Sequence, residues 1–123
     1  MNNIFTNIAA KATRLSDLMV GRDKITTEEL IANYPDGFTI NEFDVITVDA
    51  DTFPVFTIKE DKYKFAFGGA VLSNIIDEWV KQFDGSISDT SEALKQAGGV
   101  RIKFIKSRTK SGNQVTLVEV MDS

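Results

Sequence analysis

The chain has 123 residues, of which 42% are hydrophobic and 26% charged, and its formal net charge at pH 7 is -4. This composition is typical of one globular domain that can bury a hydrophobic core. Because the sequence contains no cysteine and no histidine, it excludes disulfides, thiolate nucleophiles, Cys/His zinc sites and Ser-His-Asp triads. No apolar run approaches the roughly 18 residues of a membrane span. We therefore expect a cytoplasmic protein with no signal peptide, membrane partner or cofactor.

The first part of the chain has helical patterns. Apolar side chains recur near helical spacing over residues 2–20, which predicts an amphipathic helix. Thr26 and Glu29 have the spacing of a capping box, so a short helix is expected to begin there. The sequence YPDG at residues 34–37 is a turn signal. We expect a helical extension over residues 1–34, whose helix is a candidate surface for homo-oligomerisation.

Three stretches rich in β-branched and aromatic residues follow, at 38–48, 53–59 and 62–67. Short polar turns separate them, so this pattern predicts three consecutive antiparallel strands. Alternation along the third strand separates aromatic side chains from lysines, with Tyr63, Phe65 and Phe67 on one face and Lys62 and Lys64 on the other.

In the last part of the chain, segments with the helical period of apolar residues are followed by segments with the strand alternation. Residues 70–83 have a broad apolar helical face, 89–97 predict a second short helix, and 100–106 and 114–121 predict two strands. Five strands with the main helix between the third and the fourth have the element order of an OB-fold, a small Greek-key barrel. We therefore expect an α+β, mainly β, OB-like barrel over residues 35–123.

The stretch from Arg101 to Lys110 holds five of the fourteen basic residues and no acidic one. Alternation within a strand turns Arg101 and Lys103 outward and the apolar residues between them inward. Further cations extend into the tip of the last hairpin. The candidate phosphate contacts are Arg101, Lys103, Lys106, Arg108 and Lys110, with Lys62 and Lys64 extending the basic track. The alternative is a solvated hairpin whose lysines protect a sheet edge.

Aromatic rings are the second candidate feature. Proteins that bind single strands without sequence preference stack the bases on exposed rings. Most of the rings in this chain are expected to fill the barrel. Phe53 and Tyr63 stand at strand ends next to the loops, so we expect these two rings to be exposed and to stack bases.

Two further motifs have simpler explanations. Residues 45–52, VITVDADT, resemble the DxDxT signature of haloacid-dehalogenase-like phosphotransferases. That chemistry needs a parallel α/β sheet that this chain is too short to form, and an Asp-rich β-turn explains the residues. We expect neither enzyme activity nor a metal site. Gly68-Gly69 before a helix suits either a strand-to-helix corner or an anion held by free backbone N–H groups.

Short motifs carry a family resemblance. They are PDGFTI at 35–40, the aromatic third strand that leads through Gly-Gly to an Ile/Trp helix, VRIKF at 100–104 and TKSGN at 109–113. This layout, over residues 35–120, resembles the small single-stranded DNA-binding proteins of tailed bacteriophages. The resemblance implies an OB barrel that binds single-stranded DNA without sequence preference in phage DNA replication or recombination. The N-terminal helical region has no counterpart in that family.

Two other interpretations stay open. The first is a phage-encoded interaction module or inhibitor that docks on a host protein. Its acidic face, formed by Glu42, Asp44, Asp49 and Asp51, would mimic nucleic acid or engage a basic partner. The second is a structural protein that assembles through its N-terminal helix.

Overall fold

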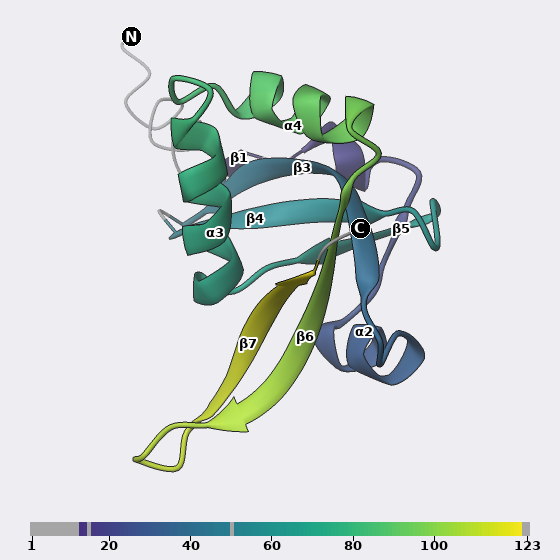
Figure 1. The fold of residues 1–123 in the computed structure, drawn as a ribbon. Coiled ribbons are helices and arrows are strands. Elements are labelled where there is room, and N and C mark those ends of the chain that lie inside the picture. The colour runs from purple at the N-terminus through teal and green to yellow at the C-terminus, as the bar shows by residue number, and fades with distance from the viewer. Residues whose placement is uncertain (1–12, 15, 50, 122–123) are drawn as a thin grey trace, which may run out of the picture.

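The structure is a computed structural model that describes residues 13–14, 16–49 and 51–121. These residues form an α+β fold in which helices pack around one mostly antiparallel sheet (Figure 1). The elements are β1 (Thr13–Arg14), the 3-10 helix η1 (Asp17–Met19), β2 (Asp23–Lys24), α2 (Thr27–Asn33), β3 (Phe38–Val48), β4 (Asp51–Ile58), β5 (Lys64–Phe67), α3 (Ala70–Lys81), α4 (Ile87–Gln96), β6 (Val100–Arg108) and β7 (Gln114–Met121). No helix in the described part of the chain is long and apolar enough to cross a membrane.

The sheet has the strand order β2-β5-β4-β3-β6-β7, and β1 also pairs with β3. Strand β3 is the centre of this arrangement, because β4 runs along one of its edges while β6 and β1 share the other. The β2–β5 pairing is parallel and the other pairings are antiparallel. Between the described residues no ladder joins β5 to β7, so the sheet is open where the expected barrel would close.

The main core lies on one face of this sheet. Three rings form its centre: Phe38 stacks on Phe56 with centroids 6.0 Å apart and meets Phe104 edge-on at 5.1 Å. Helix α3 adds Leu72 and Ile76, both 1% exposed. Alternation explains this set, because a strand turns every second side chain to the same face.

A smaller cluster lies on the opposite face, near the end of β3. Ile46, Val55 and Phe65 are buried there, and Met19 of η1 packs against them. Helix η1 therefore covers this side of the sheet, while the helices after β5 contribute to the core on the other.

Most of the predicted elements from residue 26 onward are confirmed. The capping box is present, since Thr26 Oγ1 accepts from the Glu29 N–H at 3.1 Å and the Thr26 N–H donates to Glu29 Oε1 at 3.2 Å. The helix predicted over 2–20 is wrong for residues 13–14 and 16–20, which hold β1 and η1. Residues 2–12 and 15 lie outside the described part.

The boundary predicted at residue 34 does not separate two hydrophobic cores. Ile25 and Leu30 belong to the same core cluster as the strands. Strand β2 pairs with β5 through the Asp23 N–H, which donates to the Tyr63 carbonyl at 2.9 Å, and the Ile25 N–H, which donates to the Phe65 carbonyl at 2.8 Å. The residues described before α2 are thus integral to the sheet and are not a helical extension.

The β6–β7 hairpin extends away from the rest of the molecule (Figure 1). Its register runs from Arg101 opposite Met121 to Arg108 opposite Gln114. We call its distal part, residues 105–117, the arm. Ile105 and Leu117, which face each other across the two strands, are 36% and 42% exposed.

Candidate nucleic-acid interface

An open groove of about 840 Å³ lies at the end of the sheet where β5 leads into α3. Its lining combines aromatic, aliphatic, charged and backbone groups. They come from Met19, Lys24, Ile46, Val48, Asp51, Thr52, Phe53, Phe67, Gly68, Gly69, Ala70, Ser73 and Asn74. We call this feature the aromatic groove.

Two half-buried rings give the aromatic groove its character. Phe53 and Phe67 meet edge-to-face with centroids 5.6 Å apart and an interplanar angle of 81°. Strand pairing explains their meeting, because Val55 pairs with Phe67 and Phe53 is two residues from Val55 on the same face. Each ring rests partly on the smaller core cluster and partly lines open space.

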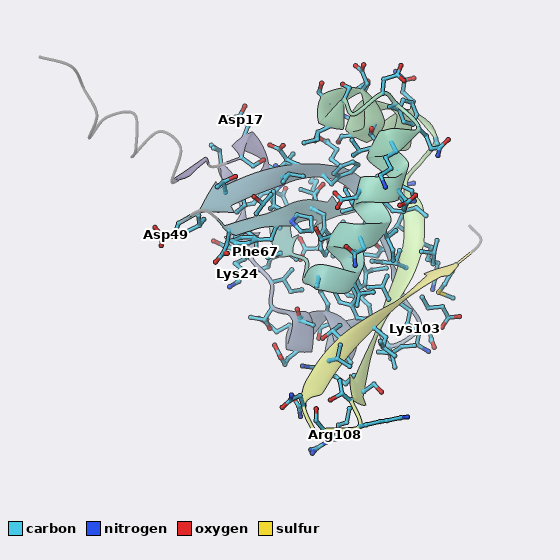
Figure 2. All side chains as sticks on the ribbon, turned by 90° about the vertical axis from the view of Figure 1, so that its left-hand side faces the viewer. Asp17, Lys24, Asp49, Phe67, Lys103 and Arg108 are labelled. Atoms are coloured by element: carbon cyan, nitrogen blue, oxygen red, sulfur yellow. The ribbon has the colours of Figure 1, made fainter. Side chains whose placement is uncertain are left out.

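A lysine stands beside these rings. Lys24 Nζ is 5.1 Å from the centroid of Phe67, a cation–π distance. The backbone places it there, because Lys24 on β2 is the parallel partner of Phe65 on β5. Figure 2 shows Lys24 and Phe67 close together, with Asp49 nearby and Arg108 far off at the other end of the molecule. The aromatic groove therefore has a positive side.

The start of α3 forms another wall of the aromatic groove. Its N-cap residue, Gly69, has no side chain, so no N-cap side chain accepts a hydrogen bond from the backbone N–H groups of the first helical turn. Gly68 allows a close approach of backbone and side chains, because a Cβ at this position would lie 2.6 Å from Leu72 Cδ2 and 2.8 Å from Pro54 Cγ. The predicted strand-to-helix corner is confirmed.

Acidic residues border the same region. Asp51 lines the aromatic groove, and Asp49, which has a φ of 49°, precedes it in the β3–β4 turn. A polyanion would be repelled from this side and attracted to the side of Lys24.

The predicted ring Tyr63 and the lysines around it lie at the opposite end of β5 from Phe67. Tyr63 is 65% exposed, and Lys62 Nζ is 5.3 Å from its ring centroid. Arg22 supports this turn, since its Nε donates to the Lys62 carbonyl at 2.9 Å. Lys64 is half-buried at the start of β5.

The predicted cations of the last hairpin do not form one row. Counting along β6 places Arg101 and Lys103 on one face, and Lys106 and Arg108 on the other, because the side chains alternate. Lys106 and Arg108 therefore do not continue the outward face of Arg101 and Lys103. The split brings positive charge to both faces of the hairpin, while Lys110 lies in its exposed tip.

Two of these cations are engaged within the chain. Arg101 Nη2 donates to the Asp36 carbonyl at 2.9 Å, and its Nε is buried without a hydrogen-bond partner among the described residues. Lys106 Nζ is 3.0 Å from Glu28 Oε1. The hydrogen bond from Lys106 holds the pKa of the Glu28 carboxyl below its ordinary value.

The remaining cations of the hairpin are more available. Lys103 faces Glu119 across the strands but is not within ion-pair distance of it among the described residues. Arg108 and Lys110 are exposed. The cations suited to an external anion are thus Arg108 and Lys110 at the tip, followed by Lys103.

The acidic residues proposed as a docking face also separate. Glu42 and Asp44 line a groove of about 480 Å³ beside α4, which we call the acidic groove. Its other acidic residues are Asp17 and Glu92. Lys95 Nζ is 3.4 Å from Glu42 Oε1. Asp49 instead lies in the β3–β4 turn, and Asp51 begins β4, where it lines the aromatic groove.

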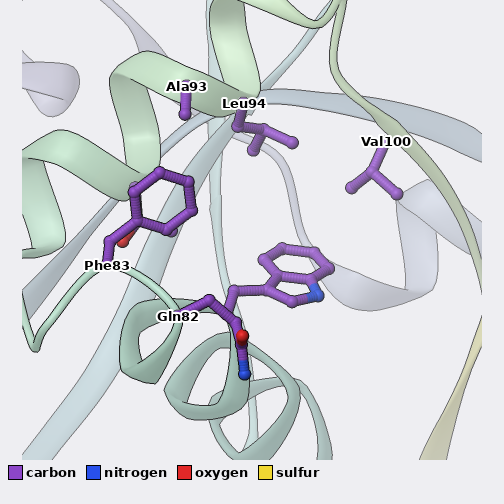
Figure 3. A pocket seen from close by; sticks show the side chains of 7 residues that line it. Gln82, Phe83, Ala93, Leu94 and Val100 are labelled. Carbon is purple, nitrogen blue, oxygen red and sulfur yellow. The ribbon is translucent and has the colours of Figure 1, made fainter.

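A third cavity, of about 300 Å³, lies between α3 and α4 (Figure 3). It is lined by Trp79, Gln82, Phe83, Thr90, Ala93, Leu94 and Val100. No charged side chain is among these residues, so the cavity offers nothing to a phosphate.

Of the predicted contacts, Phe53 lines the aromatic groove, whereas Phe67 and Lys24, which lie there with it, were not among them. Lys24 comes from a two-residue strand, too short for any alternation to reveal. The described residues contain no group of three or more His, Cys, Asp or Glu side chains that could hold a metal ion. Comparison of the chain with protein-family models, curated proteins and solved structures finds no match.

Proposed function

We propose that this protein binds single-stranded DNA without sequence preference. The observation that carries the proposal is the aromatic groove, in which Phe53 and Phe67 line open space beside the ammonium of Lys24. A ring can stack on any base, and base–ring stacking contributes about 1–3 kcal/mol per base. A neighbouring lysine attracts the phosphates that join the bases, so this pair of chemistries favours a nucleic-acid strand over an isolated apolar ligand.

An OB-like architecture supports the same proposal. The order β5-β4-β3-β6-β7, with α3 between β5 and β6, is what a five-stranded Greek-key barrel has when it is open between its third and fifth strands. We infer that the sheet is a partly open barrel of this kind. In OB-folds the hairpin that joins the last two strands borders the oligonucleotide-binding face, and here this hairpin is the basic arm.

The rings along β5 suggest a path for the strand. Phe67 ends β5 and Tyr63 lies in the turn just before it, and the three steps from Lys64 to Phe67 span about 10 Å. That separation suits bases at the two ends of β5, with Lys62 and Lys24 at the respective ends to meet phosphates. Lys64 would assist from the start of β5. The path directs the rest of the strand toward the arm, where Arg108 and Lys110 would meet further phosphates.

Fluorescence anisotropy with labelled oligo-dT tests this function. Binding should be measurable at low salt and weaken steeply as salt rises, because each phosphate contact releases counterions. Lys24→Glu should weaken binding at least tenfold. Lys81→Glu is the matched control, because Lys81 is an exposed lysine of α3 paired with Glu78 and lies outside the aromatic groove. The proposal fails if oligo-dT does not bind at low salt, or if the two variants lose affinity equally.

A second candidate function is docking of a basic protein in the acidic groove. The observation in its favour is the convergence of Asp17, Glu42, Asp44 and Glu92 around one hollow. An arginine-rich peptide titrated by calorimetry should then bind, and Asp17→Lys should abolish its binding. Undiminished binding of the peptide to that variant would exclude this candidate.

A further inference from the structure

The outer edge of the arm is an unpaired sheet edge. In the sheet, β7 has β6 as its one neighbour, so its other edge carries no ladder between the described residues. Figure 1 shows this hairpin standing out from the body of the molecule. Val118 near the base of β7 packs on the main core, but Leu117 is 42% exposed.

One hydrogen bond at the hairpin tip shows which backbone groups of β7 face this edge. The Thr109 N–H donates to the Asn113 carbonyl at 2.9 Å. Inward and outward N–H groups alternate along an antiparallel strand. The odd-numbered residues of β7 therefore bond to β6. The outward N–H and C=O groups belong to its even-numbered residues, Gln114, Thr116, Val118 and Val120.

This edge has few of the features that prevent an edge strand from pairing with a strand of another chain. Natural edge strands are protected by prolines, bulges, charged side chains or short length. Strand β7 has eight residues, QVTLVEVM, with no proline and one charged residue, Glu119. Its ladder with β6 is regular from end to end. It is thus well suited to accept another strand.

We propose that the occupant is the β7 strand of a second copy of this chain, paired antiparallel across a two-fold axis at Leu117. In this register Thr116 lies opposite Val118 of the partner subunit and Gln114 opposite Val120 of the partner subunit. All the outward backbone groups then find partners, in about eight hydrogen bonds. A shift of one strand by two residues keeps the same side chains on each face of the sheet but leaves only about six hydrogen bonds between the two strands.

The side chains fit the same register. Ile105 faces Leu117 across the hairpin, so the dimer would have one apolar row of Ile105, Leu117, Leu117 of the partner subunit and Ile105 of the partner subunit. Glu119 would lie opposite Val115 of the partner subunit, so no like charges meet across the interface. The antiparallel pairing also directs the two basic tips in opposite directions, which limits their repulsion.

This dimer is independent of single-stranded DNA binding. The aromatic groove is lined by residues of η1 and β2 to α3 and includes none from β7, so it stays open in the paired form. The register also places dimerisation in β7 and not in the N-terminal residues.

Cross-linking tests the register directly. Leu117→Cys introduces the sole cysteine of the chain. At the two-fold axis the two Cα atoms would be about 4.5 Å apart, within disulfide range. We expect a disulfide-linked dimer under mild oxidation. Val115→Cys is the matched control, because its two copies would be about 13 Å apart along the strands and should stay monomeric on a non-reducing gel. Equal cross-linking of both variants, or none of Leu117→Cys, overturns the proposal.

Sedimentation velocity tests the edge without any new cross-link. The unmodified chain should sediment as a dimer at high protein concentration. Thr116→Pro removes one outward N–H and leaves the β6 ladder intact, as prolines in edge strands do, so it should sediment as a monomer. Thr116→Val keeps the N–H and should remain a dimer, and circular dichroism checks that all three chains are folded. A monomeric unmodified chain, or a dimeric Thr116→Pro variant, overturns the proposal.

Discussion

Neighbouring glycines at the aromatic groove should respond very differently to the same substitution. A Cβ on Gly68 would lie 2.6 Å from Leu72 Cδ2 and 2.8 Å from Pro54 Cγ, whereas a Cβ on Gly69 would meet nothing within 4 Å. Leu72 is 1% exposed, so it has little room to move. Overpacking of this kind costs about 1–3 kcal/mol. We expect Gly68→Ala to lose stability in that range.

Gly69→Ala should be nearly neutral. Alanine is a poorer N-cap than glycine by several tenths of a kcal/mol, while the smaller conformational freedom of the unfolded chain offsets about 0.4–1 kcal/mol. Urea unfolding monitored by the fluorescence of Trp79 measures both variants. Equal midpoints for Gly68→Ala and Gly69→Ala would refute the close packing at the floor of the aromatic groove.

Three further predictions concern the charges and rings. Replacing both Arg108 and Lys110 by alanine should lower the slope of log affinity for oligo-dT against log salt by about 1.4, since each contact with a single strand contributes about 0.7; an unchanged slope would place the DNA elsewhere. Phe53→Leu should weaken the binding of oligo-dT by about 5- to 150-fold, which corresponds to the loss of one stacked base. If the ring serves packing alone, anisotropy should show no loss of affinity. The Lys106 hydrogen bond lowers the pKa of Glu28 below its ordinary 4.5, so the contact stabilises the fold above pH 4.5 and this stabilisation is lost as the pH falls through the lowered pKa. In urea unfolding at stepped pH, Glu28→Gln should not show this loss of stability at acid pH. A pH profile identical to that of the unmodified chain would count against the contact.

The alternation of apolar residues along strands and their helical period elsewhere were sufficient to predict most of the strands and helices. Phe38, Phe56 and Phe104 come from three strands that the pattern identified, and they meet in the core because each occupies an inward position. The same rule of alternation separates the cations of the last hairpin. Arg101 and Lys106 differ by an odd number of residues, so one strand turns them to opposite faces.

Other features arise from pairings that no local pattern encodes. Strands β1 and β2 have two residues each, and they form because β3 and β5 offer them free backbone groups. The Arg22 guanidinium links η1 to the β4–β5 turn, since its Nη1 donates to the Leu18 carbonyl at 3.0 Å and its Nε to the Lys62 carbonyl. Lys24 reaches Phe67 only through this three-dimensional arrangement.

The aromatic groove and the arm are separate features, and oligonucleotide length should distinguish their contributions. Figure 2 shows Lys24 and Arg108 at well-separated places, so a short strand cannot engage both. OB-folds bind about 4–16 nucleotides. For oligo-dT near the lower limit, Lys24→Ala should weaken binding while Arg108→Ala has no effect. Near the upper limit both should weaken it, because a strand anchored in the aromatic groove then reaches the tip. If Arg108→Ala weakens short and long oligonucleotides alike, the arm is a binding site in its own right and the proposed single path is wrong.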